Sequence, residues 1–145
     1  MVPLTSHGSW KFTAGLILFG ALLIALYWII WFFVDRSILA SQTTDAYYIF
    51  ENSFPAADAW LAGTSIVGAI GLLRRRAWGL FATTLASSSA IYLGCMDVLY
   101  NLQNGVYAMP DKGAVGAEMG INVLSFGIGI YCILFTWQNR ASFAR

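Results

Sequence analysis

Charged residues are scarce in this sequence. Only 10% of its 145 residues are charged and 59% are hydrophobic, whereas a soluble domain carries about 25% charged residues. The net charge is +1, so the chain has neither the basic surplus that attracts nucleic acid nor an acidic tail. This composition excludes a disordered chain, a disulfide scaffold and an ordinary soluble enzyme domain. It indicates a small membrane protein that contacts the lipid bilayer and no nucleic acid.

Histidine is almost absent, which limits the cofactors that one chain can hold. The only histidine is His7, so a haem with two histidine ligands and a histidine-rich zinc site are both excluded. No lysine lies within a long apolar segment, and this excludes a retinal Schiff base. The sequence also has no Walker loop, no dinucleotide-binding glycine motif and no serine-hydrolase elbow. We therefore expect no haem, retinal or zinc site, and we consider catalysis less favoured than a non-catalytic role.

Cysteine is scarce as well, with Cys95 and Cys132 as its only examples. The helical rise places them about 19 Å apart in depth on their predicted helices. The Cα atoms of a disulfide must lie within about 7 Å of each other. We therefore expect both thiols to be reduced and to act as small packing side chains.

Long apolar runs dominate what remains. A transmembrane helix needs about 20 mostly apolar residues, and four segments qualify. Transmembrane helices are predicted at about 12–34, 55–73, 77–104 and 114–137. The segments between and after them are outer loops at 35–54 and 105–113, an arginine turn at 74–76 and a tail at 138–145. The arginine turn is so short that its two helices must be antiparallel neighbours. The predicted fold is a single all-α integral membrane domain, an antiparallel bundle of four transmembrane helices.

Basic residues indicate the orientation of this bundle. Six of the eight Lys and Arg residues fall on one predicted face: Lys11, Arg74, Arg75, Arg76, Arg140 and Arg145. The positive-inside rule then places both termini and the arginine turn in the cytoplasm. The chain is similar to small four-span proteins of bacteria, which implies a location in the bacterial cytoplasmic (inner) membrane.

Acidic residues show the opposite bias. With this orientation all seven lie in the outer loops or in the outer parts of helices. Four of them fall in the outer loops, where we expect them to be solvated: Asp35, Asp45, Glu51 and Asp111.

Asp58, Asp97 and Glu118 differ because they fall within three different predicted helices, at a similar depth. Each lies on a stripe of small or polar residues, with Asn101 on the third helix and Asn122 on the fourth. Small residues let transmembrane helices approach closely, and a carboxylate that faces lipid is unfavourable. We therefore predict that these five side chains form an acidic cluster in the outer mouth of the bundle. Oxygen ligands of this kind suit a hard metal cation, protons or an amine.

Two other features predict contacts with a second chain. Gly116 and Gly120 form a close-packing motif on the fourth helix. Tyr27, Trp28 and Trp31 give the first helix a bulky aromatic surface, for which exposure to lipid is the alternative. Either surface suits another membrane protein or a second copy of this chain.

Three functions are compatible with these features. The favoured one is a non-catalytic accessory subunit that scaffolds or stabilises a larger membrane assembly or a homo-oligomer, because the chain is small and lacks catalytic motifs. The first alternative is a transport-like protein that binds a cation, protons or an amine at the carboxylate cluster. The second is an intramembrane enzyme that uses a carboxylate on a lipid-like substrate.

Overall fold

Four long helices make up most of the protein. The computed structural model describes residues 7–143, and within that range the chain forms helices and turns without a strand. The long helices are α1 (His7–Ile30), α3 (Pro55–Leu73), α4 (Ala77–Gln103) and α5 (Lys112–Asn139). Together with the short turns and helix beside them, they give four stretches that are long and apolar enough to cross a membrane. The prediction of four such helices is confirmed.

Local signals explain where the helices begin and end. Pro55 occupies the first turn of α3, where its missing N–H is not needed. α4 ends just before Gly105, whose φ of 66° lies in the left-handed region that favours glycine. Asp111 caps α5, because its carboxylate accepts hydrogen bonds from the backbone N–H groups of Gly113 and Ala114.

The segment predicted as a first outer loop is more structured than expected. It contains the short helix α2 (Asp45–Glu51), which Thr44 caps by accepting a hydrogen bond from the backbone N–H of Tyr47 at 3.2 Å. A π-helical turn at Trp31–Asp35 and a 3-10 turn at Arg36–Ile38 precede it. The sequence did not reveal α2 because seven residues are too few for a clear helical periodicity.

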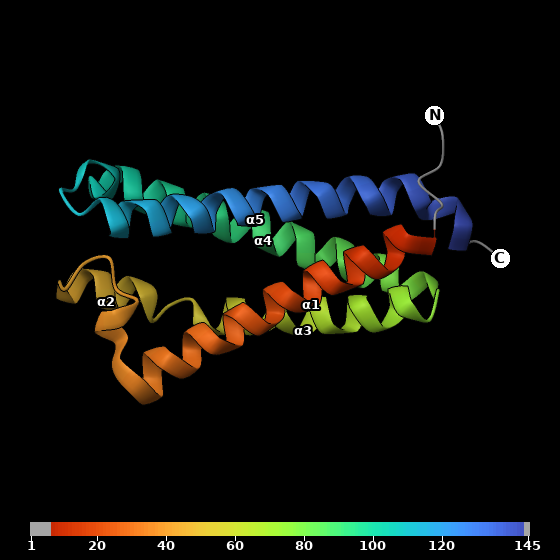
Figure 1. The fold of residues 1–145 in the computed structure, drawn as a ribbon, viewed down its shortest axis with the longest axis horizontal. Helices are drawn as coiled ribbons and strands as arrows, with labels where there is room; N and C mark the ends of the chain where they lie inside the picture. Colours follow the sequence, from red (N-terminus) through yellow and green to blue (C-terminus); the bar gives the residue numbers. More distant parts are fainter. Residues whose placement is uncertain (1–6, 144–145) are drawn as a thin grey trace.

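The long helices pack in the order α1, α3, α4, α5, and α1 also touches α5. Figure 1 shows that both ends of the described chain lie at one end of the molecule, here called the terminal end. α2 lies at the opposite end, here called the α2 end. A compact apolar core fills the terminal end, and it consists of Trp10, Ala14, Ile17, Ala69, Leu72, Leu80, Cys132 and Phe135.

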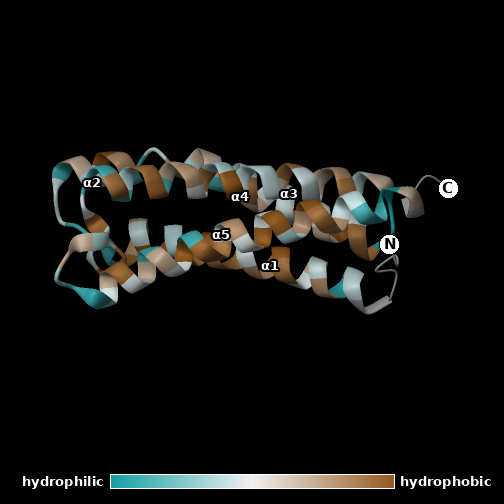
Figure 2. Cartoon of the chain, turned by 90° about the horizontal axis from the view of Figure 1, so that it is seen from above, coloured by the Kyte–Doolittle hydropathy of each residue, from teal (hydrophilic) through white to brown (hydrophobic). Residues whose placement is uncertain are grey.

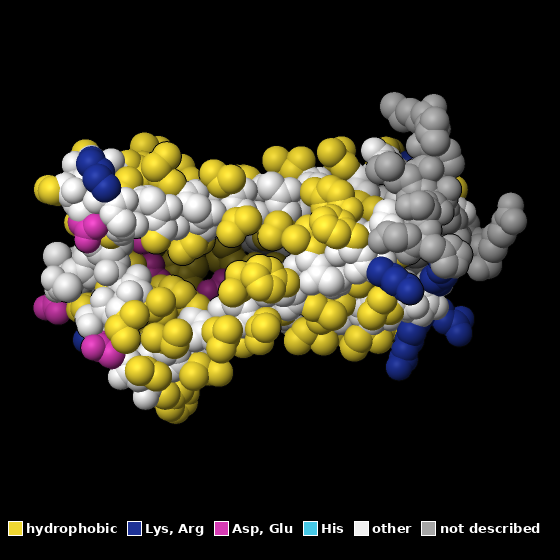
Figure 3. All heavy atoms as spheres, viewed as in Figure 1, with side chains coloured by type: hydrophobic (Ala, Val, Ile, Leu, Met, Phe, Trp, Pro, Cys, Tyr) yellow, Lys and Arg dark blue, Asp and Glu magenta, His cyan; other side chains and the backbone are white. Residues whose placement is uncertain are grey.

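Charge and hydropathy follow the long axis of the molecule. The helices carry hydrophobic residues along most of their length (Figure 2), including faces that are exposed in the isolated chain. Most of the visible Lys and Arg side chains gather at the terminal end, whereas the Asp and Glu side chains lie at the α2 end together with fewer basic ones (Figure 3). Arg145, which contributed to the predicted charge bias, lies outside the described residues. Such apolar outer surfaces suit a lipid bilayer.

Candidate functional site

A cavity of about 330 Å³ lies between the helices, and α1, α3, α4 and α5 all contribute to its walls. Most of its lining is apolar; the acidic side chains occupy the part nearest α2, and Ser65, Ser87 and Ser125 lie further along the helices. Four acidic residues line it, namely Glu51, Asp58, Asp97 and Glu118. Among the described residues that line it, none is a lysine, arginine or histidine. The volume falls in the range of small-molecule sites, which is about 300–1,000 Å³.

Asp97 and Glu118 come together through Asn101. The amide nitrogen of Asn101 lies 3.2 Å from Oδ2 of Asp97 and 3.4 Å from Oε2 of Glu118. Tyr107 extends this network, since its hydroxyl lies 3.0 Å from Nδ2 of Asn122 and 3.5 Å from Nδ2 of Asn101. Four of the five residues of the predicted cluster therefore belong to one hydrogen-bonded network.

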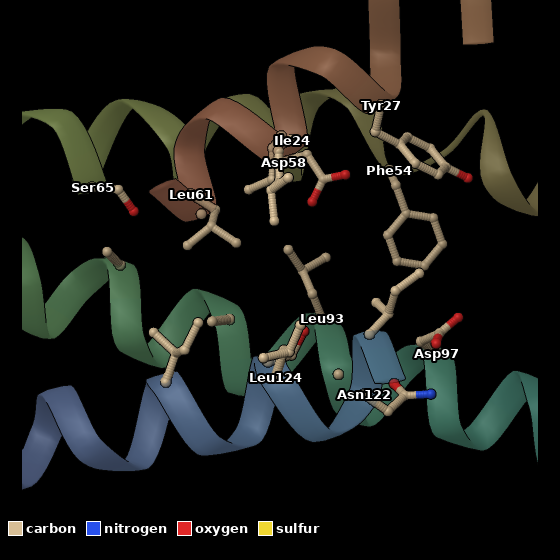
Figure 4. A pocket seen from close by; sticks show the side chains of 18 of the residues that line it. Ile24, Tyr27, Phe54, Asp58, Leu61, Ser65, Leu93, Asp97, Asn122 and Leu124 are labelled. Atoms are coloured by element: carbon tan, nitrogen blue, oxygen red, sulfur yellow. The ribbon is translucent and has the colours of Figure 1, made fainter. Parts of the chain in front are cut away.

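Asp58, the fifth predicted residue, stands apart from this network. Its carboxylate accepts a hydrogen bond from the indole N–H of Trp28 at 2.9 Å. Figure 4 shows it on the α3 side of the cavity, facing Asp97 and Asn122 on the opposite side. The three predicted carboxylates thus share one cavity, but no hydrogen bond joins Asp58 to the other two.

Glu51 is the acidic residue that the sequence placed wrongly. It was expected to be solvated in a loop, but only 9% of its surface is exposed. Its Oε2 accepts a hydrogen bond from the hydroxyl of Tyr27 at 2.9 Å. The reason is α2, which turns Tyr47 and Glu51 to one buried face. The spacing of four residues between these two was the available signal, because such residues share a helix face.

The aromatic residues at the end of α1 and at the start of the π-helical turn after it also differ from expectation. Tyr27, Trp28 and Trp31 were predicted to form an outward surface for a partner or for lipid. In the structure Trp31 is buried and donates its indole N–H to Oδ1 of Asn52 at 2.9 Å. Tyr27 and Trp28 are half-buried and donate to acids of the same chain. Their polar edges turn inward because they donate hydrogen bonds to acceptors there. The exposed aromatic residues of this region are Phe32 and Phe33 instead.

Gly116 and Gly120 lie on an exposed face of α5. A Cβ atom added at either position would meet no other atom within 4 Å. This face therefore packs against no other helix within the described chain.

Two buried oxygen atoms near the cavity lack hydrogen-bond donors. Oδ1 of Asn101 and Oδ1 of Asn122 have no hydrogen-bond partner among the described residues, although these two residues are only 1% and 5% exposed. Asn122 lines the cavity, and Figure 4 shows its side chain at the cavity wall. An unsatisfied buried acceptor is unfavourable by about 1–3 kcal/mol. Together with the four carboxylates, Oδ1 of Asn122 makes the polar part of the cavity rich in hydrogen-bond acceptors.

Among residues 7–143, no group of three or more His, Cys, Asp or Glu side chains is arranged to hold a metal ion. Both cysteines are free, with Cys132 buried and Cys95 exposed. A search of family models, curated proteins and solved structures found no match to this chain.

Proposed function

We propose that this membrane protein binds an amphipathic molecule with a protonated amine head in the cavity at its α2 end. The observation that carries the proposal is that the cavity has hydrogen-bond acceptors at one end and a mostly apolar lining elsewhere. Its polar part offers carboxylates and the unpaired Oδ1 of Asn122, without a basic side chain among the described lining residues. The rest of the lining is mostly apolar, with Ser65, Ser87 and Ser125 as its polar members, and suits a hydrocarbon tail.

An amine fits this site better than the other candidate ligands. Carboxylates within a bilayer are unfavourable unless a counter-charge or proton compensates them. An ammonium group supplies both a positive charge and N–H donors, and its hydrogen bonds to carboxylates are stronger than neutral ones. The same carboxylates would repel an anion. A metal ion lacks N–H donors for these acceptors, and no group of three or more His, Cys, Asp or Glu side chains among the described residues is arranged to hold one.

A thermal-shift titration in lipid nanodiscs tests this proposal. Dodecylamine should raise the unfolding temperature in a saturable way, because a ligand that binds the folded state stabilises it. Dodecanol and dodecanoate are the matched probes, with the same tail and a neutral or anionic head. The variant Glu118→Gln should lose the shift, whereas Asp45→Asn, at an exposed acid of α2, should keep it. Equal shifts with dodecanol and dodecylamine would refute recognition of the amine.

The proposal includes an orientation in the membrane. We infer an antiparallel bundle with both termini and the arginine turn in the cytoplasm of a bacterial cell, which puts the α2 end and its cavity in the outer leaflet. The gathering of Lys and Arg at the terminal end supports it (Figure 3). Gln42→Cys and Arg74→Cys probe the orientation from opposite ends of the molecule. In a background without native cysteines, an impermeant maleimide added outside should label Gln42→Cys and not Arg74→Cys. The reverse pattern would contradict the orientation.

A role as an accessory subunit is the second candidate, and one observation favours it. The face that carries Gly116 and Gly120 is open, with room for the backbone of another helix. If this face joins two chains, Gly116→Leu and Gly120→Leu should lower the native mass in mild detergent. Gly63→Leu, at an open and exposed glycine of α3, is the control. A monomeric wild-type protein would exclude self-association, and unchanged co-purification from the two variants would exclude a partner on this face.

A further inference from the structure

The route into the cavity follows from how its two possible openings are built. One opening would lead through the α2 end of the molecule, where water would lie. The other would lead sideways between α1 and α5, into the hydrocarbon of the bilayer. The side chains at these two places differ in packing and in polarity.

α2 closes the first opening. The ring of Phe50 stacks on Tyr100 of α4, with centroids 3.8 Å apart and planes 11° apart. Tyr47 is only 2% exposed, and the indole of Trp31 holds Asn52 at the end of α2 by a hydrogen bond. Glu51 is tied to α1 by the hydroxyl of Tyr27. α2 is therefore joined to both α1 and α4 and covers the acidic end of the cavity.

The side between α1 and α5 is open in the same half of the molecule. The two helices touch near the terminal end, where Trp10 meets Phe135 with ring centroids 5.2 Å apart and the hydroxyls of Thr13 and Tyr131 lie 3.0 Å apart. From there α1 diverges from α5 toward the α2 end (Figure 1). Figure 3 shows the resulting hollow, with acidic side chains visible inside it.

The rim of this side opening is apolar. Four cavity-lining residues of α1 and α5 are also among the exposed large hydrophobic residues: Phe19, Leu23, Ile121 and Leu124. Their exposed fractions run from 42% for Leu23 to 56% for Phe19. A rim of this kind suits hydrocarbon chains and is unfavourable in water.

We infer that the ligand is a single-tailed lipophilic amine dissolved in the bilayer, and that it reaches the cavity sideways between α1 and α5 beneath a closed α2. This inference rests on the proposed function for the identity of the ligand. The path itself depends only on the geometry. A tail can stay in contact with apolar side chains along the whole path while the amine meets the acceptors at its end.

The path can be tested without the amine, by the reactivity of a cysteine placed in the cavity. Ser125 lines the cavity on α5, and Ser125→Cys is made in a Cys95→Ala, Cys132→Ala background. In vesicles, an alkyl maleimide dissolved in the lipid should modify this cysteine. A charged water-soluble thiol reagent, present on both faces of the vesicles, should not modify it. Gln42→Cys serves as the positive control for the charged reagent.

A plug in the side opening provides the second arm of the test. Gly20 lines the cavity on α1 and has space for a side chain, so Gly20→Trp should slow the lipid-phase modification of Ser125→Cys several-fold. Gly15→Trp, at an exposed glycine of the same helix outside the cavity, should not slow it. Modification of Val123→Cys, which is 69% exposed on the outside of α5, should not respond to either variant.

Two results would overturn the inference. Modification of Ser125→Cys by the charged reagent would show that α2 does not seal the cavity. A lipid-phase rate that Gly20→Trp leaves unchanged would show that the path does not run between α1 and α5. Because neither result involves dodecylamine, they are distinct from a failure of amine binding, which would refute the proposed function and leave the path standing.

Discussion

The terminal half and the α2 half of this protein are built from the same helices but packed in opposite ways. In the terminal half, Gly71 of α3 and Gly79 of α4 lie so close that a Cβ atom on either would overlap the backbone of the other. A Cβ atom on Gly68 would lie 2.8 Å from Oγ1 of Thr83. In the α2 half the helices enclose a cavity of about 330 Å³. The close glycine contact of α3 with α4 is thus confined to the terminal half, whereas α4 and α5 also pack closely in the α2 half, where a Cβ atom on Gly94 would lie 3.3 Å from Cβ of Ser125.

Large side chains with polar edges replace small ones where the helices separate. Trp28 on α1 reaches Asp58 on α3, and Tyr27 reaches Glu51 on α2. Such pairs join the helices through hydrogen bonds between long side chains, whereas glycine contacts need the closest approach of two backbones. The bundle therefore combines a closely packed half with a hollow half, where we propose that the ligand binds.

The largest effect is expected at the glycine contact between α3 and α4. Gly71→Ala forces a methyl group into the backbone of Gly79, and overpacking of this kind is unfavourable by about 1–3 kcal/mol. We expect a value at the upper end because neither backbone can rotate away. The free energy of unfolding in mixed micelles, measured by titration with denaturing detergent, would show it.

Gly63→Ala is the matched control for this prediction. Gly63 lies on the same helix, is exposed and has no atom within 4 Å of an added Cβ. Its replacement should be neutral or stabilising, because alanine favours helix by up to about 1 kcal/mol over glycine. Equal destabilisation by both variants would mean that the close contact between Gly71 and Gly79 does not contribute to the stability of the terminal half.

The acids of the α2 half should give effects of opposite sign on stability and on binding. Glu118→Gln removes a buried charge, so the empty protein should be as stable as the wild type or more stable. The affinity for dodecylamine should fall by about 2 kcal/mol, because a buried charge pair loses one partner. Unfolding and binding titrations in nanodiscs would measure the two quantities. A loss of stability without a loss of affinity would make Glu118 a structural residue.

The sequence predicts the four long helices better than it predicts the position of α2. Length, apolarity and the signals at Pro55 and Gly105 place the four long helices within a few residues of the structure. The network of Asp97, Asn101 and Glu118 was also predictable as a set, because carboxylates avoid lipid. The inward turn of Tyr27 and the burial of Glu51 were not, because both depend on where α2 lies across the bundle. That position is a tertiary property and has no period in the sequence.

A smaller effect on the free energy of unfolding is expected at the hydrogen bond between Trp28 of α1 and Asp58 of α3. Trp28→Phe keeps the aromatic ring and removes the N–H donor to Asp58. Hydrogen bonds between membrane helices contribute about 1–2 kcal/mol in model peptides and about 0.6 kcal/mol on average in a folded bundle. We expect a loss of about 1 kcal/mol in the free energy of unfolding. Phe32→Leu, at a position that is 56% exposed, should change it by less than about 0.5 kcal/mol. If both variants change the free energy of unfolding equally, the hydrogen bond from the indole does not stabilise the fold.

The smallest effects on the free energy of unfolding are expected at the two cysteines, one of which lies in each half. Cys132 is fully buried in the packed core, so Cys132→Ala leaves a small void and should lower the free energy of unfolding by about 1 kcal/mol. Cys95 is exposed on α4 in the α2 half, and Cys95→Ala should change it by less than about 0.5 kcal/mol. Because both thiols are free, the wild type should migrate identically with and without reductant on a denaturing gel. Equal losses in the free energy of unfolding at both positions would show that the two halves respond equally to a missing atom. Such a result would contradict the contrast between a packed and a hollow half.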